Sequence, residues 1–456
     1  MGPKPTTTRE GEVEVFEDGG EAQKERETEL VSLLGFREVR EELFMRPHEN
    51  AGDREMRAST LRAVVVLEAL AFLVTLLGLW YIPNDGEYII IFRVFYFPLL
   101  PLVAMLWLWG VNVQVWTQFR LNYLKVFEVE DRVILPCHED VFKMAHIFSL
   151  IVLASSSFFL FCTLFGFEIL AIRQAELLYL ILIVLILLPG DWIFGKQRRF
   201  FVSTLTRIAL PFWEVSFADF LLADVVTSLA RPLADTAVVG CRITSSYLGL
   251  GLRKTSDVCN AHSWTYSAAL ALPYAWRLVQ CVKIYSSRGE RPQLANAVKY
   301  FTAFPVIYFS AMKYHSPRED WVGFYRPAWI ACAVLNSGFS YYWDIARDWE
   351  FQLFSPGKGT VLRPDLVYEN KKGYRLAILS NLVLRISWTC KLSAQLRHLY
   401  GLSLVLSLME VFRRFQWMFL RIEVALLKDL RKAYSGGGGG GAGGAKRRAD
   451  VKASLL

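Results

Sequence analysis

The most unusual residues of this chain are charged side chains inside an apolar segment of helix length. Between Leu404 and Leu430, Glu410, Arg413 and Arg414 are surrounded by leucine, valine, phenylalanine and methionine. A charged side chain at the centre of a bilayer costs about 2.5–3.5 kcal/mol on insertion scales, so such residues usually face partners or water. Guanidinium groups bind oxyanions through paired N–H donors. The segment is therefore expected to form one wall of an anion site.

Further charged residues lie within or beside other apolar segments. Arg385 has apolar neighbours on both sides in LVLRISW, and Trp388 lies three positions later on the same helix face. Asp344 and Asp348 are four apart in YYWDIARDWE, which also places them on one face. Because Arg413 and Arg414 are adjacent, they project about 100° apart, so one is expected to grip an anion while the other holds Asp344 or Asp348 as a gate. The remaining candidates are Asp224 in FADFLLADVV and Lys299 in NAVKYF.

Structural explanations compete for part of this set. Asp219 and Asp348 could cap helices or pair with loop arginines, and Lys299 could extend its ammonium group to the lipid headgroups. Trp388 and Trp417 could pack in the protein or anchor a span at the membrane interface, which tryptophan does more often than it contacts a ligand. The three arginines lie inside their apolar segments and do not fit these explanations.

Composition places the chain among polytopic membrane proteins. Of its 456 residues, 54% are hydrophobic, which is more than a soluble domain of this size usually has. The net charge of +8 does not indicate nucleic-acid binding, because the basic residues flank the apolar runs instead of forming one polar face.

Ten membrane-spanning helices are expected from apolar runs of about 20 residues. The fifth is the weakest, because Glu214, Asp219 and Asp224 interrupt it, and the two aspartates are five apart and should serve different partners. Basic residues collect after alternate spans, which favours both termini in the cytosol, with the basic loop at 231–262 as the exception. The expected spans are 61–82, 88–110, 142–165, 175–194, 212–230, 267–285, 297–312, 324–343, 373–390 and 400–420.

Four regions follow from this pattern. Residues 1–59 form a polar, partly disordered cytosolic segment without a signal peptide, in which 30–45 could be an amphipathic surface helix. Residues 60–200 hold the first transmembrane helices, and residues 201–434 hold the transport core. Residues 435–456 read as a glycine-rich, basic, disordered tail, since no strand precedes the glycines as a phosphate-binding loop would require.

Other chemistries fit less well. An intramembrane aspartyl protease is disfavoured, because a G-x-G-D motif is absent and nearby arginines would keep both acids ionised. Cys137, His138 and Glu139 are consecutive, which is poor spacing for a metal, so no metal or cofactor is expected. Cys241 and Cys259 share the loop assigned to the non-cytosolic side. A disulfide between them and two free thiols are equally expected there.

Six segments in register carry a family resemblance: FADFLLADVVTSL, LPYAWRLVQCVKIY, LANAVKYFTAFP, YYWDIARDW, LVLRISWT and EVFRRFQW. With WGVNVQVW after the second span, they resemble the EXS domain family, which includes the xenotropic and polytropic retrovirus receptor and plant phosphate exporters. Exporters of that family also carry an SPX sensor domain, and the short acidic N-terminal segment here does not resemble one. In this respect the chain is similar to the shorter yeast Golgi protein whose loss causes secretion of endoplasmic-reticulum residents.

The resemblance implies a phosphate path lined by motif residues of the exporters. These are the acid of LLAD, the lysine of AxKY, both acids of WDxxxDW, the arginine and tryptophan of LRxxW, and the glutamate and arginine pair of ExxRR. Each motif position is matched here. The implied phosphate-binding residues are Asp224, Lys299, Asp344, Asp348, Arg385, Trp388, Glu410, Arg413 and Arg414.

The chemistry of these residues suits phosphate. Arg385, Arg413 and Lys299 can donate to its oxygens, and Asp224 or Glu410 can accept its hydroxyl proton, which fully ionised sulfate lacks. Four bases and four acids would leave the empty site near neutral, so that binding stays weak enough for release.

We therefore expect an all-helical EXS-type transporter that is not an enzyme and that moves inorganic phosphate passively, as a channel or uniporter. It would return lumenal phosphate from the Golgi to the cytosol, or export it at the plasma membrane. The alternative is a non-transporting Golgi factor that retains glycosyltransferases. Membrane lipids are the expected surroundings, and a homodimer remains open.

Overall fold

The computed structural model describes residues 51–81, 86–119, 121, 123–127, 137–190, 194–210, 212–248, 259–354, 360–368, 370–393 and 401–435. In these residues all regular structure is helical and no strand occurs, as expected. Residues 50–431 form one compact unit, which contains every candidate site residue. The expected helix at 30–45 and the glycine-rich tail after residue 435 lie outside the described residues.

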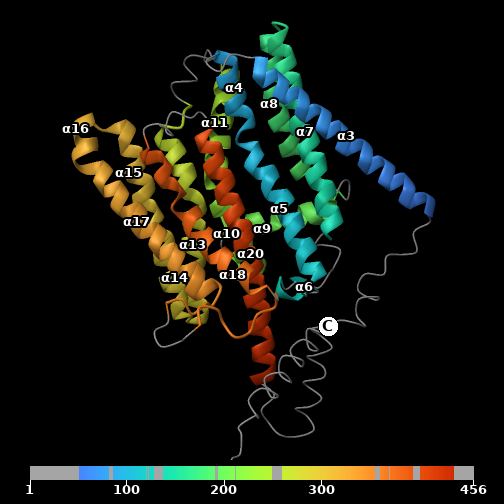
Figure 1. Ribbon diagram of the computed structural model, residues 1–456. Helices are drawn as coiled ribbons and strands as arrows, with labels where there is room; N and C mark the ends of the chain where they lie inside the picture. The colour runs from blue at the N-terminus through green and yellow to red at the C-terminus, as the bar shows by residue number, and fades with distance from the viewer. Residues whose placement is uncertain are drawn as a thin grey trace, which may run out of the picture. The chain divides into compact units, whose positions relative to one another are not determined.

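The first part of this unit is built from long apolar helices (Figure 1). Stretches 62–80, 87–118, 138–164 and 168–187 are long and apolar enough to cross a membrane. They correspond to the first four expected spans, although α8 ends at Leu187 and not at Phe194. The helices are α3 (Ala51–Tyr81), α4 (Glu87–Tyr96), α5 (Leu99–Gln118), α7 (His138–Leu164) and α8 (Glu168–Leu187), with the short α6 (Tyr123–Val126) after α5.

A hydrophobic core joins α3, α4, α5, α7 and α8 and reaches α11 (Ala230–Tyr247). Phe92, Phe159 and Tyr179 are among its buried members. Helix α3 packs along α7, where the Thr75 and Ser156 hydroxyls are 3.0 Å apart. The opposite face of α3 exposes large aliphatic side chains, as expected for a surface in contact with lipid.

The second part contains more polar helices of widely different lengths, from three residues in α16 to 34 in α20. The expected loop at 231–262 is wrong for most of its length, because α11 is helical up to Tyr247. Helices α15 and α17 lie side by side (Figure 1). The remaining elements are α9 (Gly195–Ala209), α10 (Phe217–Ser228), α13 (Trp264–Arg288), α14 (Arg291–Phe301), α15 (Ala303–His315), α16 (Arg318–Asp320), the π-helix η1 (Trp321–Tyr325), α17 (Arg326–Trp343), the π-helix η2 (Asp344–Asp348), α18 (Lys371–Arg385), the 3-10 helix η3 (Ser387–Leu392) and α20 (Leu402–Ser435).

Two helix breaks have a common cause in the sequence. Helix α10 ends at Ser228, four residues before Pro232, and α14 ends at Phe301, four residues before Pro305. Proline has no N–H to donate to the carbonyl four residues earlier, so the helix is interrupted at that carbonyl. The expected span at 297–312 is therefore divided at Thr302. Both breaks lie directly after residues that carry the candidate site.

A disulfide joins Cys241 on α11 to Cys259, with their Cα atoms 5.6 Å apart. Five residues after Cys259, α13 begins, capped by the Ser263 hydroxyl, which accepts a hydrogen bond from the Tyr266 backbone N–H. The disulfide therefore ties the start of α13 to α11.

Candidate functional site

Helix α20 supplies the centre of the site. Arg413 is buried, and its guanidinium binds the Glu410 carboxylate, one turn earlier on the same helix. The neighbouring Arg414 projects in another direction, as expected from the 100° turn per residue. Trp417 lies one turn beyond Arg413 and is fully buried. Helix α20 therefore presents two cations in different directions, and an indole N–H, to the other helices.

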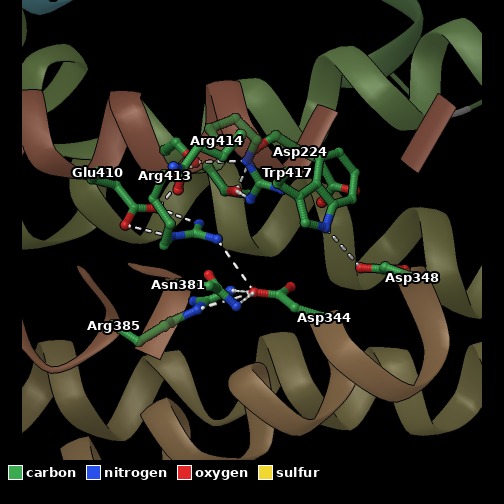
Figure 2. Close-up of polar contacts among 12 residues, drawn as sticks. Asp224, Asp344, Asp348, Asn381, Arg385, Glu410, Arg413, Arg414 and Trp417 are labelled. Atoms are coloured by element: carbon green, nitrogen blue, oxygen red, sulfur yellow. Dashed lines mark hydrogen bonds and ion pairs between the residues drawn. The ribbon is translucent and has the colours of Figure 1, made fainter. Parts of the chain in front are cut away.

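Asp344 gathers donors from two helices (Figure 2). Its Oδ2 atom lies 2.7 Å from Arg385 Nη2, 3.3 Å from Arg413 Nη1 and 3.1 Å from Asn381 Nδ2. Asp344 is nearly inaccessible to solvent, so this carboxylate exists as an ion only because the two guanidinium groups compensate its charge.

Asp348 contacts two other residues of α20. Trp417 Nε1 donates to its Oδ2 at 3.1 Å, and Arg421 Nε is 3.9 Å from its Oδ1. Asp344 and Asp348 are four residues apart, as are Arg413 and Trp417, so the two contacts repeat at the same spacing. The prediction that both aspartates share a face is confirmed, and that face is turned toward α20.

Asp224 on α10 forms the most deeply buried ion pair of the site. Arg277 on α13 is 0% exposed, and its Nε is 2.9 Å from Asp224 Oδ1. The Tyr300 hydroxyl also donates to this carboxylate. Arg277 was not among the residues predicted for the site, although its position among apolar residues in LPYAWRLVQ satisfies the criterion that singled out Arg385.

Arg414 has hydroxyl partners instead of a carboxylate. Its Nε donates to Ser228 Oγ at 2.8 Å, and its Nη2 is 3.3 Å from Thr227 Oγ1. Its guanidinium also lies 4.4 Å from the centroid of the Trp417 ring. The residue is 5% exposed, and none of the described carboxylates lies within ion-pair distance of it. Thr227 and Ser228 end α10, so the proline-induced break places them beside this cation.

Lys299 is the second buried cation without a carboxylate partner in the described part of the chain. It is 7% exposed and lies in the last turn of α14. Its Nζ lies over the rings of Tyr300 and Trp343, 4.3 and 5.3 Å from their centroids. Its charge acts on Asp224, Asp344 and Asp348 at longer range. An unpaired buried ammonium is costly unless an anion joins it.

We call these charged residues the charged cluster. Four bases and four acids were expected to balance, and this expectation is wrong, because Arg277 and Arg421 add two bases. The fully ionised cluster therefore carries two excess positive charges. Its members are Arg277, Lys299, Arg385, Arg413, Arg414, Arg421, Asp224, Asp344, Asp348 and Glu410.

The structure does not bring every predicted residue into this cluster. Trp388 lies in η3, where its indole N–H donates to Ser337 Oγ at 3.0 Å and its ring packs against Trp329. Asp219 pairs with Arg207 at 2.8 Å and caps α10, so the expectation that Asp219 and Asp224 serve different partners is confirmed. Trp417, considered above as a packing residue, is the tryptophan that contacts a cluster acid.

Comparison with known proteins gives the family. A model described as the EXS family matches residues 88–427. A Danio rerio protein named xenotropic and polytropic retrovirus receptor 1 homolog is 33% identical over 338 residues, which is 71% of this chain and 48% of that protein. The human solute carrier family 53 member 1 is 29% identical over 342 residues, again 71% and 48% of the two chains. A Dictyostelium discoideum protein named SPX and EXS domain-containing protein 1 is 29% identical over 340 residues, 71% of this chain and 36% of that protein.

The chain thus spans about half the length, or less, of the relatives it matches. The matched region contains the whole charged cluster and, from residue 88 on, three of the four long apolar stretches; the first, 62–80, precedes it. With the family and these helices together, the chain is an integral membrane protein that belongs to the EXS family.

Proposed function

We propose that this protein moves inorganic phosphate across its membrane. The observation that carries the proposal is that Lys299 and Arg414 are buried and lack carboxylate partners among the described residues. Two excess positive charges match the charge of hydrogen phosphate, which would complete the pairing of both cations. Two similar relatives are named as retrovirus receptor homologues, and the human one is named as a solute carrier.

Cluster acids and a bound anion would compete for the same arginine N–H donors, which favours release of the anion as well as its binding. Arg385 and Arg413 already share Asp344, so a phosphate ion would have to displace part of this contact to bind them. Binding that exchanges one partner for another is weaker than binding to free guanidinium groups, and weak binding permits passage. The sequence has no ATP-binding motif of the P-loop type, so we propose passive, channel-like or uniport transport down the phosphate gradient.

The membrane and the direction form the finer part of the proposal. We place the protein in the Golgi membrane, where it would return lumenal phosphate to the cytosol, and we keep efflux at the plasma membrane as the second location. Either direction uses the same charged cluster. Imaging of the tagged protein against Golgi and plasma-membrane markers distinguishes the two locations.

Phosphate flux in proteoliposomes tests the transport itself. The purified protein should release trapped labelled phosphate, and Arg414→Gln should lower the rate by about tenfold or more, since it removes a charge-assisted donor. Lys143→Gln is the matched control, because Lys143 is about half-exposed and pairs only with Asp140 on the surface. Its rate should equal that of the wild type.

Flux from wild-type vesicles no faster than from empty vesicles would contradict the transport proposal. In that case, cells carrying Arg414→Gln should still retain their Golgi glycosyltransferases if the protein is a non-transporting retention factor. If the wild-type protein does transport phosphate, loss of both flux and retention in Arg414→Gln would make retention a consequence of transport.

A further inference from the structure

Asn381 lies inside the charged cluster but carries no charge itself. It is on α18, one turn before Arg385, and it is 1% exposed. Its Nδ2 donates to Asp344 Oδ2 at 3.1 Å (Figure 2). None of the described residues donates a hydrogen bond to its Oδ1 atom. A buried acceptor without a donor is unfavourable, so Oδ1 is poised for a group that the protein itself does not supply.

The orientation of this amide follows from its neighbour. Asp344 is flanked by Arg385 and Arg413 and is therefore an ionised carboxylate, which can only accept hydrogen bonds. The end of the Asn381 side chain that faces Asp344 must be the NH2 group. The opposite end must then be the oxygen, so the unpaired atom is an acceptor and not a donor.

The carboxylates first expected to accept a phosphate hydroxyl are already occupied. Both Asp224 oxygens accept from Arg277, and Tyr300 adds a further donor. Both Glu410 oxygens accept from Arg413, and Ser228 donates to one of them. Asp344 Oδ1 and Asp348 Oδ1 also accept no hydrogen bond from the described residues, but both belong to charged carboxylates, whereas Asn381 Oδ1 is a neutral acceptor that does not repel an anion.

We propose that Asn381 determines which oxyanions this site accepts, by accepting the hydroxyl of hydrogen phosphate with its amide oxygen. The inference rests on the proposed phosphate transport and identifies the group that accepts a hydrogen bond from the phosphate hydroxyl. Arg385 and Arg413, on either side, supply donors to the other oxygens. A tetrahedral oxyanion without a hydroxyl would place a bare oxygen against Oδ1, leaving one acceptor unpaired and facing another.

Oxyanion competition tests this role in proteoliposomes of the full chain at neutral pH. Arsenate carries a hydroxyl there, whereas sulfate and selenate do not. Arsenate should inhibit wild-type phosphate flux at about tenfold lower concentration than sulfate or selenate, as expected for one buried acceptor left unpaired. In Asn381→Leu, arsenate inhibition should weaken until this difference nearly disappears, while sulfate inhibition should be unchanged or stronger.

Asn336→Leu is the matched control. The Asn336 amide donates to the hydroxyl of Thr302, which lies between α14 and α15, and it has no hydrogen bond to a cluster carboxylate. Its arsenate-to-sulfate ratio should equal that of the wild type. An unchanged ratio in Asn381→Leu would overturn the role of Asn381 while leaving transport intact, and absent wild-type flux would overturn the proposed function itself.

Folding of the variant is followed by size-exclusion chromatography in detergent. If Asn381→Leu aggregates, Asn381→Ala, which removes the amide oxygen and leaves a smaller side chain, should lose the same discrimination. Equal inhibition by sulfate and arsenate in the wild type would overturn the inference without any variant.

Discussion

Arg413 on α20 and Arg385 at the end of α18 contact the same oxygen of Asp344, at 3.3 and 2.7 Å. Two helices that are separate in the sequence are thus held together by one carboxylate. The donors that an anion would need are the donors that Asp344 already occupies. Asp344 is therefore placed to compete with the anion, and release of a bound anion would restore the contact.

Asp344→Asn should tighten phosphate binding and slow transport. The substitution removes a negative charge from beside Arg385 and Arg413, so an anion no longer competes for their N–H groups. We expect about tenfold tighter binding, measured by calorimetry with the purified protein, together with slower flux. Asp365→Asn is the control, because Asp365 forms a surface pair with Arg431. Weaker phosphate binding in Asp344→Asn would instead mean that Asp344 orients the arginines.

Arg277→Gln should destabilise the protein more than the loss of a surface charge would. It leaves Asp224 buried without its cation, which costs about 3–5 kcal/mol for a buried pair. The double variant with Asp224→Asn removes both charges and should recover much of the thermal unfolding midpoint in detergent. It should not recover phosphate flux if Asp224 and Arg277 shape the transport site. Equal midpoints for the single and double variants would contradict the pairing.

Part of the site could be predicted from residue type and position. A charged residue with apolar neighbours on both sides pointed to Arg385, Arg413 and Arg414, and the four-residue spacing placed Asp344 and Asp348 on one face. The same criterion, applied to the sixth span, would have found Arg277. The charge balance could not be obtained without it, so the near-neutral site was a wrong expectation with a clear cause.

Other features depend on three-dimensional contacts that no local pattern records. Trp388 and Trp417 have similar apolar surroundings in the sequence, but only Trp417 faces an acid, because Trp388 follows the end of α18 and turns toward Ser337. The fifth expected span ended within two residues of the end of α10, but helix α11 after it was expected as a loop. The break at Thr302 was missed, although Pro305 signals it. The number of membrane crossings in the second part remains a prediction.

Gly110→Ala should loosen the packing of α5 on α7. A Cβ atom at Gly110 would lie 2.7 Å from Cε1 of the Phe142 ring, too close unless one helix or the ring moves. We expect a loss of about 1–3 kcal/mol, as for other overpacked sites, seen as a lower unfolding midpoint. Phe142→Leu in the same chain should relieve the clash. Gly240→Ala is the control, since a Cβ there would have no atom within 4 Å; a similar loss in both alanine variants would rule out the clash.

The disulfide can be tested by counting thiols. The denatured, unreduced protein should take up alkylating reagent at five cysteines and, after reduction, at seven, as read by mass spectrometry. Cys241→Ser should leave six reactive thiols under both conditions and lower the unfolding free energy by about 3 kcal/mol, the loop-closure value for a separation of this size. Seven reactive thiols before reduction would contradict the bond.

Equilibrium binding of labelled phosphate to the purified protein tests the central claim, that two buried cations have no carboxylate partner among the described residues and gain an anionic partner when phosphate binds. Wild-type protein should bind one phosphate per chain. Lys299→Met should weaken binding by about tenfold or more, because the ammonium charge is lost while an apolar side chain is kept. Lys143→Met on the surface should bind as the wild type does. Equal phosphate affinity in Lys299→Met and wild-type protein, or no binding by either, would contradict the account.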